Sequence, residues 1–141
     1  MKALEIDDNL AEAHISLANV RMWHRWGKGA EEEFQKGLQL NPNYSTGHQW
    51  YSIYLAVTGR LTEAIAEMEK ARELDPFSII INVELGCPYL YSKQYDRAIE
   101  YFQKALEMDS DFPFAHFALA EAYDQTGRYE QALAEHAFSH C

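Results

Sequence analysis

Apolar and polar positions follow one another along this chain with the period of amphipathic helices. Apolar residues recur every three or four positions, as in Ala11, Ile15, Ala18 and Met22. This spacing places apolar side chains on one face of a helix. Short stretches containing Gly, Pro, Asn or Asp separate the periodic segments, which indicates helices joined by tight turns. The pattern therefore predicts an all-α chain.

The helical pattern repeats at a fixed interval along the chain. Pro42 and Pro76 are 34 residues apart, and the next step falls on Ser110. Four further columns have the same spacing: Ala30, Ala64, Ala98 and Ala132; Phe34, Met68, Phe102 and His136; Leu17, Tyr51, Leu85 and Leu119; Ala18, Ser52, Gly86 and Ala120. A period of this length indicates a solenoid, in which each unit buries its apolar face against its neighbours.

These columns resemble the tetratricopeptide repeat, a helix-turn-helix unit of this length. The residues that carry the resemblance are, in the third copy, Leu85, Gly86, Tyr89, Tyr95, Ala98, Phe102 and Ala105, and in the fourth, Leu119, Tyr123, Gly127, Tyr129 and Ala132. The resemblance covers nearly the whole chain. It implies a right-handed superhelical solenoid of antiparallel helix pairs.

The period sets the boundaries of the expected repeats at residues 11–44, 45–78, 79–112 and 113–141, with the last one incomplete. Residues 1–10 align with the ends of later second helices, so we expect a stub of a preceding repeat, a linker at Asp7 and Asp8, and a helix cap at Asp8 or Asn9. The chain then reads as a fragment of a longer array. Its repeats resemble arrays appended to bacterial signalling proteins.

Two places depart from a regular repeat. Trp23 and Trp26 precede Gly27 and Gly29 in the first turn, which predicts an irregular corner where the tryptophans fill packing gaps. Pro88 falls in the middle of the third repeat's first helix, where proline costs about 3 kcal/mol unless the helix kinks. We expect a kink near residues 84–88, which either is a tolerated distortion or widens a groove.

Composition and charge narrow the function classes. The net charge of −10 argues against a nucleic-acid partner, because a polyanion would be repelled. No apolar stretch approaches the ~20 residues of a membrane span, so no membrane partner is expected. Cys87 and Cys141 do not form a disulfide framework, and a cytoplasmic, reducing compartment is the default expectation.

The histidines raise the question of a metal site. His14, His48 and His116 occupy equivalent places in different repeats, so they are too far apart to share an ion, and we expect them to pack between helices. A second group, His136, His140 and Cys141, lies within one segment, but it lacks a recognised motif. We expect His136 to pack in the column of Phe34 and Phe102, and we expect no metal.

Nothing in the sequence converges on catalysis. We find no nucleophile elbow, phosphate-binding glycine loop or paired cysteine motif. Cys87 lies beside Pro88 in a helix with no histidine at helical spacing, which predicts an inert thiol. We expect a non-enzymatic protein without a cofactor.

The resemblance implies that the first helices line a concave groove that binds an extended or helical peptide of a partner protein. Carried over to this sequence, the groove residues are Asn19, Met22, Trp23, Gln49, Trp50, Ile53, Val83, Glu84, Cys87, Tyr91, Phe117, Glu121 and Asp124. Apolar anchors mixed with amides and acids are typical of a peptide-binding patch. Glu84, Glu121 and Asp124 favour a segment with apolar anchors and a basic end.

The carboxylate clamp of chaperone-binding family members is not expected. Asn19 matches one clamp asparagine, but Ile15, Trp50 and Val83 stand where basic or amide residues are needed. An acidic C-terminal tail is therefore not the expected ligand. Trp50→Ala should abolish peptide binding, with Glu33→Ala as the surface control.

The sequence predicts a non-catalytic protein-interaction scaffold. The alternative is a structural element that stacks or dimerises through exposed apolar residues at its terminal helices, namely Leu4, Ile6, Leu133, Ala137 and Phe138. A molecular mass that depends on concentration would favour this self-association.

Overall fold

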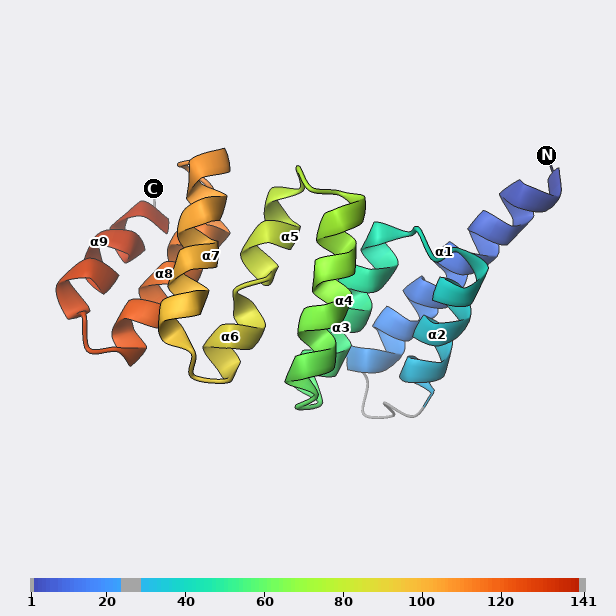
Figure 1. Cartoon of the computed structure of the whole chain (residues 1–141), viewed down its shortest axis with the longest axis horizontal. Coiled ribbons are helices and arrows are strands. Elements are labelled where there is room, and N and C mark those ends of the chain that lie inside the picture. The colour runs from blue at the N-terminus through green and yellow to red at the C-terminus, as the bar shows by residue number, and fades with distance from the viewer. Residues whose placement is uncertain (1, 24–28, 140–141) are drawn as a thin grey trace. The chain divides into compact units, whose positions relative to one another are not determined.

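The computed structural model describes the backbone of residues 2–23 and 29–139 and the side chains of residues 10–22 and 29–137. These residues form α-helices joined by short turns, which confirms the predicted all-α fold (Figure 1). The helices are α1 (Lys2–Trp23), α2 (Ala30–Leu40), α3 (Ser45–Val57), α4 (Leu61–Leu74), α5 (Ile79–Glu84), α6 (Cys87–Tyr91), α7 (Tyr95–Met108), α8 (Pro113–Gln125) and α9 (Tyr129–Ser139). The chain divides into two compact units, residues 1–75 and 76–141.

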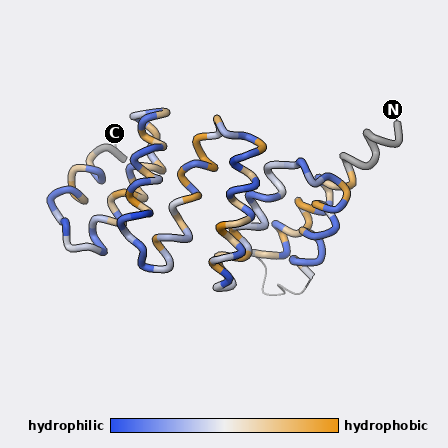
Figure 2. Tube along the Cα trace, in the orientation of Figure 1, coloured by the Kyte–Doolittle hydropathy of each residue, from blue (hydrophilic) through white to orange (hydrophobic). Residues whose placement is uncertain are grey.

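Unit 1 consists of two helix pairs, α1 with α2 and α3 with α4. Hydrophobic and hydrophilic residues alternate along the chain trace (Figure 2). The buried cluster contains Ile15, Ala18, Phe34, Tyr51, Leu55 and Ala64. All six come from positions with helical spacing, so the core of unit 1 is the apolar face that the sequence pattern predicts.

Unit 2 has the same plan with a divided first helix. α5 and α6 both pack against α7, and α8 pairs with α9. Its largest fully buried side chains are Ile81, Val83, Leu85, Phe102 and Leu119. Gly86 lies directly on the ring of Phe102, since a Cβ at this position would be 2.5 Å from a ring carbon. A residue with a side chain would push the two helices apart.

The first helix of the third repeat is interrupted where Pro88 predicts a kink, and this confirms the expectation. α5 ends at Glu84 and α6 begins at Cys87 (Figure 1). Between them, the Gly86 amide donates to the Val83 carbonyl at 3.0 Å, which is a tighter turn than an α-helix makes. Pro88 therefore falls in the first turn of α6, where its missing N–H is not needed.

The N-terminal segment differs from the expectation. α1 runs without a break from Lys2 to Trp23, so the linker placed at Asp7 and Asp8 and the cap at Asp8 or Asn9 are wrong. Pro42 and Pro76 lie in later turns between repeats and Pro113 begins α8, whereas Asp8 keeps its amide N–H and costs a helix only a few tenths of a kcal/mol. The irregular turn expected around Trp26 lies outside the described residues.

The turns that end the first helices use a left-handed residue at one repeated position. Gly59 has φ of 86° and Gly127 has φ of 76°, and both occupy the same column. Lys93 lies between them in that column with φ of 64°, and among the described residues it is the non-glycine residue with positive φ. Lysine loses roughly 1–2 kcal/mol in this conformation, which glycine adopts freely.

Replacing Lys93 with glycine should therefore stabilise the fold. We expect Lys93→Gly to raise the free energy of unfolding by about 0.5–1 kcal/mol, because relief of strain exceeds the added entropy of the unfolded chain. Urea denaturation followed by circular dichroism measures this. Lys93→Ala, which keeps the Cβ, is the control and should show no gain; a glycine variant no more stable than wild type would contradict the assignment of strain.

Candidate functional site

The groove residues expected in unit 1 lie on α1 and α3. Asn19, Met22, Gln49, Trp50 and Ile53 are all half-buried. Trp50 packs against the buried cluster of unit 1 with part of its indole left accessible. The side chain of the expected groove residue Trp23 lies outside the described residues. This face of unit 1 therefore offers partly accessible apolar and amide groups.

The groove residues expected in unit 2 lie on α5, α6 and α8. Phe117, Glu121 and Asp124 follow one another at helical spacing on α8, and all three are exposed. Tyr91 ends α6 with 59% of its surface accessible, and the ring of Phe117 is 50% exposed. The half-buried members are Glu84 and Cys87. Together these residues define the acidic–aromatic surface: Glu84, Cys87, Tyr91, Phe117, Glu121 and Asp124.

Val83 was expected in the same groove, and the structure places it elsewhere. Its side chain is 0% exposed and belongs to the core of unit 2. Successive residues of an α-helix differ by about 100° in direction, so Val83 points into the core while its neighbour Glu84 reaches the surface. The expectation for Val83 is wrong because the sequence alone does not fix the rotation of the short helix α5.

Electrostatic effects connect four residues of the acidic–aromatic surface, namely Glu84, Cys87, Tyr91 and Glu121. Burial, and then the negative charges of Glu84 and Glu121, raise the pKa of Cys87 to about 12. Burial also raises the pKa of Tyr91, and the same groups of α5, α6 and α8 add to it. Because α5 packs against α8, carboxylates 37 positions apart in sequence lie near one thiol.

His136 lies at the border of this surface and was not expected there. Its Nε2 is 3.5 Å from a carboxylate oxygen of Asp124, and its ring meets that of Phe117 edge to face with centroids 6.5 Å apart. Phe117 and His136 are 19 residues apart, as are His48 and Glu67. Residues with this separation face each other across a helix pair, so the repeat spacing could have predicted the contact. His140 and Cys141 lie outside the described residues.

The chemistry available at this surface is that of binding. With a pKa near 12, Cys87 stays a protonated thiol and is a poor nucleophile. In the described parts of the chain, no group of three or more His, Cys, Asp or Glu side chains is arranged to hold a metal ion. Three carboxylates beside two exposed aromatic rings can hold a cationic side chain through ion pairs and cation–π contacts.

The column histidines lie between paired helices, as expected. His14, His48 and His116 each contact a glutamate of the second helix of their own pair. The partner of His14 is Glu33, which is 7% exposed and also receives a hydrogen bond from Arg21. Glu33 is therefore unsuitable as the surface control proposed from sequence.

Among the helices that the structure describes, none is both long enough and apolar enough to cross a membrane.

Comparison with known proteins agrees with this architecture. Residues 89–135 match a family model described as tetratricopeptide repeat. The Pseudomonas aeruginosa type IV pilus assembly protein PilF is 30% identical over 133 residues, which cover 93% of this chain and 53% of that protein. The solved structure of P. aeruginosa PilF superposes with a TM-score of 0.79 at 28% identity, covering 98% of this chain and 63% of that one.

Other relatives show how widely the fold is shared. Mouse superkiller complex protein 3 is 26% identical over 137 residues, covering 96% of this chain and 9% of that protein. The solved structure of MamA has a TM-score of 0.76 at 21% identity, covering 98% of this chain and 81% of that one. The chain thus spans about half of PilF and a small part of the superkiller protein.

The helix pairs, their repeated columns and these matches define a helical-repeat protein. The chain belongs to the tetratricopeptide repeat family. Proteins of this family are typically non-catalytic scaffolds for protein–protein interaction.

Cys87 provides a direct probe of the site. In a Cys141→Ser background at pH 8, we expect its alkylation by iodoacetamide to be roughly a thousandfold slower than that of a free cysteine of pKa about 8.5, because the thiolate is rare. Unfolding in guanidinium should restore normal reactivity. Labelling of the native protein as fast as that of the unfolded one would contradict the buried, acid-flanked position of the thiol.

Proposed function

We propose that the acidic–aromatic surface of unit 2 binds a peptide segment of a partner protein that has an apolar side chain next to a lysine or arginine. The observation that carries this proposal is that one compact unit exposes two aromatic side chains, Tyr91 on α6 and Phe117 on α8. The same unit carries Glu84 on the adjoining α5, and Glu121 and Asp124 on α8. The side chains come from three helices of one compact unit. A rigid helical frame therefore presents them in a fixed arrangement.

The aromatic rings supply the apolar part of the binding energy. Half of the Phe117 ring and more than half of Tyr91 are in contact with water. Full burial of a side chain of this size gains about 1.5–3 kcal/mol, so covering the exposed half of Phe117 is worth about 1 kcal/mol. Aromatic anchors of this kind contribute strongly at protein interfaces. An apolar side chain of the partner would pack on one of these rings.

The carboxylates supply the preference for a basic partner. Glu84 and Glu121 lie close enough to the half-buried Cys87 to add to the rise in its pKa. Asp124 extends the negative charge along α8. The net charge of −10 would also draw basic segments toward the protein, an effect that salt weakens. We therefore expect affinity to fall as ionic strength rises.

Unit 1 offers a second, less acidic contact surface. Trp50 and Ile53 on α3, together with Met22 on α1, are partly accessible apolar groups, and Asn19 and Gln49 are amides that can bond to a peptide backbone. We propose that a partner of sufficient length uses this surface as well. Protein partners are supported by relatives whose names describe subunits of complexes, such as superkiller complex protein 3 and fission yeast anaphase-promoting complex subunit 3.

A second candidate function is self-association through α9. Leu133 is 69% exposed and Tyr129 is 65% exposed on this helix. These side chains could pack against a second copy of the chain, as apolar patches often do. Light scattering over a range of concentrations distinguishes this candidate, because a peptide reader can remain monomeric while a self-associating element gains mass.

A peptide-display selection tests the proposed surface. The wild-type protein should enrich a consensus that pairs an aromatic or aliphatic residue with a lysine or arginine. Phe117→Ala should bind the selected peptides at least about tenfold more weakly, because it removes a central anchor. Glu121→Gln should reduce affinity mainly at low salt, because it removes charge without changing shape.

The matched control is Glu100→Ala, which removes an exposed carboxylate from α7 instead of α8. It should leave the affinity of the selected peptides unchanged. Equal binding by wild type and Phe117→Ala, or a consensus rich in aspartate and glutamate, would contradict the proposal.

A further inference from the structure

His48 connects three segments of unit 1 through both of its ring nitrogens. Nδ1 is 2.6 Å from a carboxylate oxygen of Glu67 on α4, and Nε2 is 2.7 Å from the carbonyl oxygen of Pro42 in the turn before α3. A neutral imidazole carries one N–H, so it can donate one of these bonds and would face the other acceptor with a lone pair. To donate to both oxygen atoms, the imidazole ring needs a second N–H, which means one more proton.

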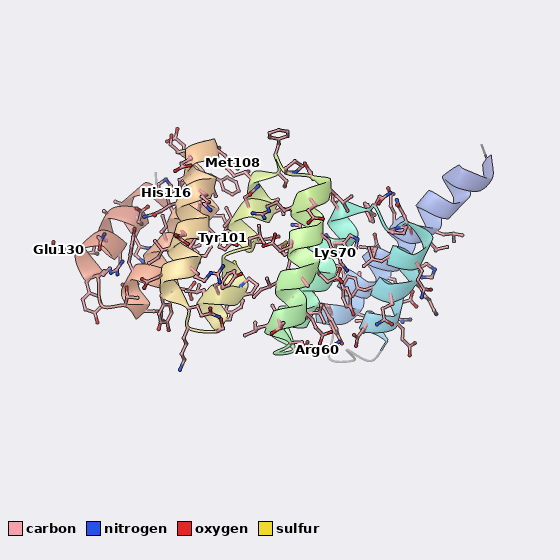
Figure 3. The ribbon with its side chains drawn as sticks, in the orientation of Figure 1. Arg60, Lys70, Tyr101, Met108, His116 and Glu130 are labelled. Atoms are coloured by element: carbon pink, nitrogen blue, oxygen red, sulfur yellow. The ribbon has the colours of Figure 1, made fainter. Side chains whose placement is uncertain are left out.

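The same arrangement recurs in unit 2. Nδ1 of His116 contacts the carboxylate of Glu135 on α9, and Nε2 is 2.7 Å from the carbonyl oxygen of Ser110 (Figure 3 labels His116). Ser110 is six residues before His116, as Pro42 is six residues before His48. We call this arrangement of histidine, second-helix glutamate and preceding carbonyl a proton clasp.

In the other two repeats the histidine, the glutamate or the carbonyl of the preceding turn is missing. His14 contacts Glu33, but the residue six positions earlier is Asp8, which lies inside the continuous helix α1. In the third repeat the position holds Asn82, whose amide donates to the Pro76 carbonyl at 3.1 Å and the Ser78 carbonyl at 2.8 Å. There, Tyr101 stands in the glutamate column. The third repeat therefore lacks both the histidine and the glutamate of this arrangement.

We propose that the proton clasps of His48 and His116 each hold a proton at neutral pH, and that loss of this proton in mildly alkaline solution loosens the helix pairs α3–α4 and α8–α9. In each clasp an imidazolium donates one ring N–H to the carboxylate and the other to the preceding carbonyl oxygen. This form carries one proton more than a neutral imidazole beside a carboxylate.

The surroundings of each histidine favour the protonated clasp. Burial acts to lower the pKa of His48, but hydrogen bonds to Glu67 and the Pro42 carbonyl outweigh it and raise the pKa above its usual value. Burial also acts to lower the pKa of His116. The hydrogen bonds to Glu135 and to the Ser110 carbonyl outweigh burial, so the pKa of His116 is raised as well. Burial acts to raise the pKa of Glu67, but His48 and Lys70 lower it below the usual value.

The charged groups around His48 come from the neighbouring helices α4 and α2. α4 contributes Glu67 and Lys70, of which Lys70 opposes the proton. α2 contributes neutral groups, Gln35, Leu38 and Gln39, to a hollow of about 370 Å³ that His48 and Tyr51 also line. The Tyr51 hydroxyl donates to Glu31 at 2.9 Å, which places a further carboxylate on this side. The nearest charge remains that of Glu67.

Around His116 the charged groups are acidic. α9 contributes Glu135, and the turn before α8 contributes Asp111. By repeat register, the α7 residues equivalent to those beside His48 are Gln103, Leu106 and Glu107, so the titratable group on that side is another carboxylate. The two charges named here, those of Glu135 and Asp111, both favour the proton on His116. We therefore expect His116 to hold its proton at least as firmly as His48.

The direction of the pH effect follows from the raised pKa of each histidine. Below about pH 6.5 the histidines are protonated in both the folded and the unfolded chain, and the clasps contribute fully. Above that pH the unfolded chain releases these protons while the folded chain retains them. Stability then falls as the pH rises through the folded pKa. On the acid side, stability falls again as Glu67 becomes protonated, because its pKa is lowered on folding.

The clasps are independent of the proposed peptide site, although they share helices with it. α3 carries Trp50 and Ile53, and α8 carries Phe117, Glu121 and Asp124. Each clasp fixes the start of one of these helices to its partner helix and to the preceding turn.

Nitrogen-15 NMR of the histidine rings tests the proposal directly. At pH 7, His48 and His116 should show both ring nitrogens protonated, with titration midpoints above the reference value of about 6.5. Glu67→Gln should lower the midpoint of His48, and Glu135→Gln that of His116. Glu73→Gln, which removes an exposed carboxylate from α4, should change neither midpoint.

Thermal unfolding supplies the second measurement. Between pH 7 and pH 9, the Tm of the wild type should fall more than that of a His48→Asn, His116→Asn double variant, since asparagine bonds to carbonyls at this position in the third repeat without titrating. If that variant does not fold, Glu67→Gln serves in its place. A neutral ring at pH 7, a midpoint at or below about 6.5, or an equal decline in variant and wild type would overturn the proposal.

Discussion

Close approach of the two helices within each pair is the constraint on which the rest of this structure depends. The first helices present a column of small residues: Ala18, Ser52, Gly86 and Ala120. Gly86 lies on the ring of Phe102 with no room for a Cβ, and the Ser52 hydroxyl donates to the Ala64 carbonyl at 2.6 Å. Helices this close must be joined by short turns, which explains the left-handed residues there. The outward faces then remain available for binding.

The sequence predicted most of the fold because the same packing requirement recurs every 34 residues. Repetition identified the helix pairs, and the chemistry of Pro88 identified the interruption between α5 and α6. The expected break at Asp7 and Asp8 was wrong because no strong local constraint acts there. Aspartate permits either a helix or a turn with a small difference in free energy, so the sequence does not decide between them. Strong local constraints were predictable, and weak ones were not.

The candidate site was predicted in part. Helical spacing placed Phe117 on the exposed side of α8, where the structure has it. Val83 and Glu33 were assigned to the surface, but both are buried. For Val83, the sequence of the six-residue helix α5 does not fix its rotation. For Glu33, the sequence of α2 alone does not reveal its partner on the neighbouring helix. The paired columns held a usable signal: histidine occurs with a glutamate 19 positions later three times, and Asn82 occurs with Tyr101.

The proposed function requires a peptide to bind unit 2 at the surface formed by α5, α6 and α8. An amide chemical-shift map of the labelled protein, recorded as a display-selected peptide is added, tests this directly. The largest changes should cluster at residues 84, 87, 91, 117, 121 and 124, and the outer residues of α7 around Glu100 and Lys104 should be unaffected. A footprint centred on α7, or on Tyr129 and Leu133 of α9, would contradict it.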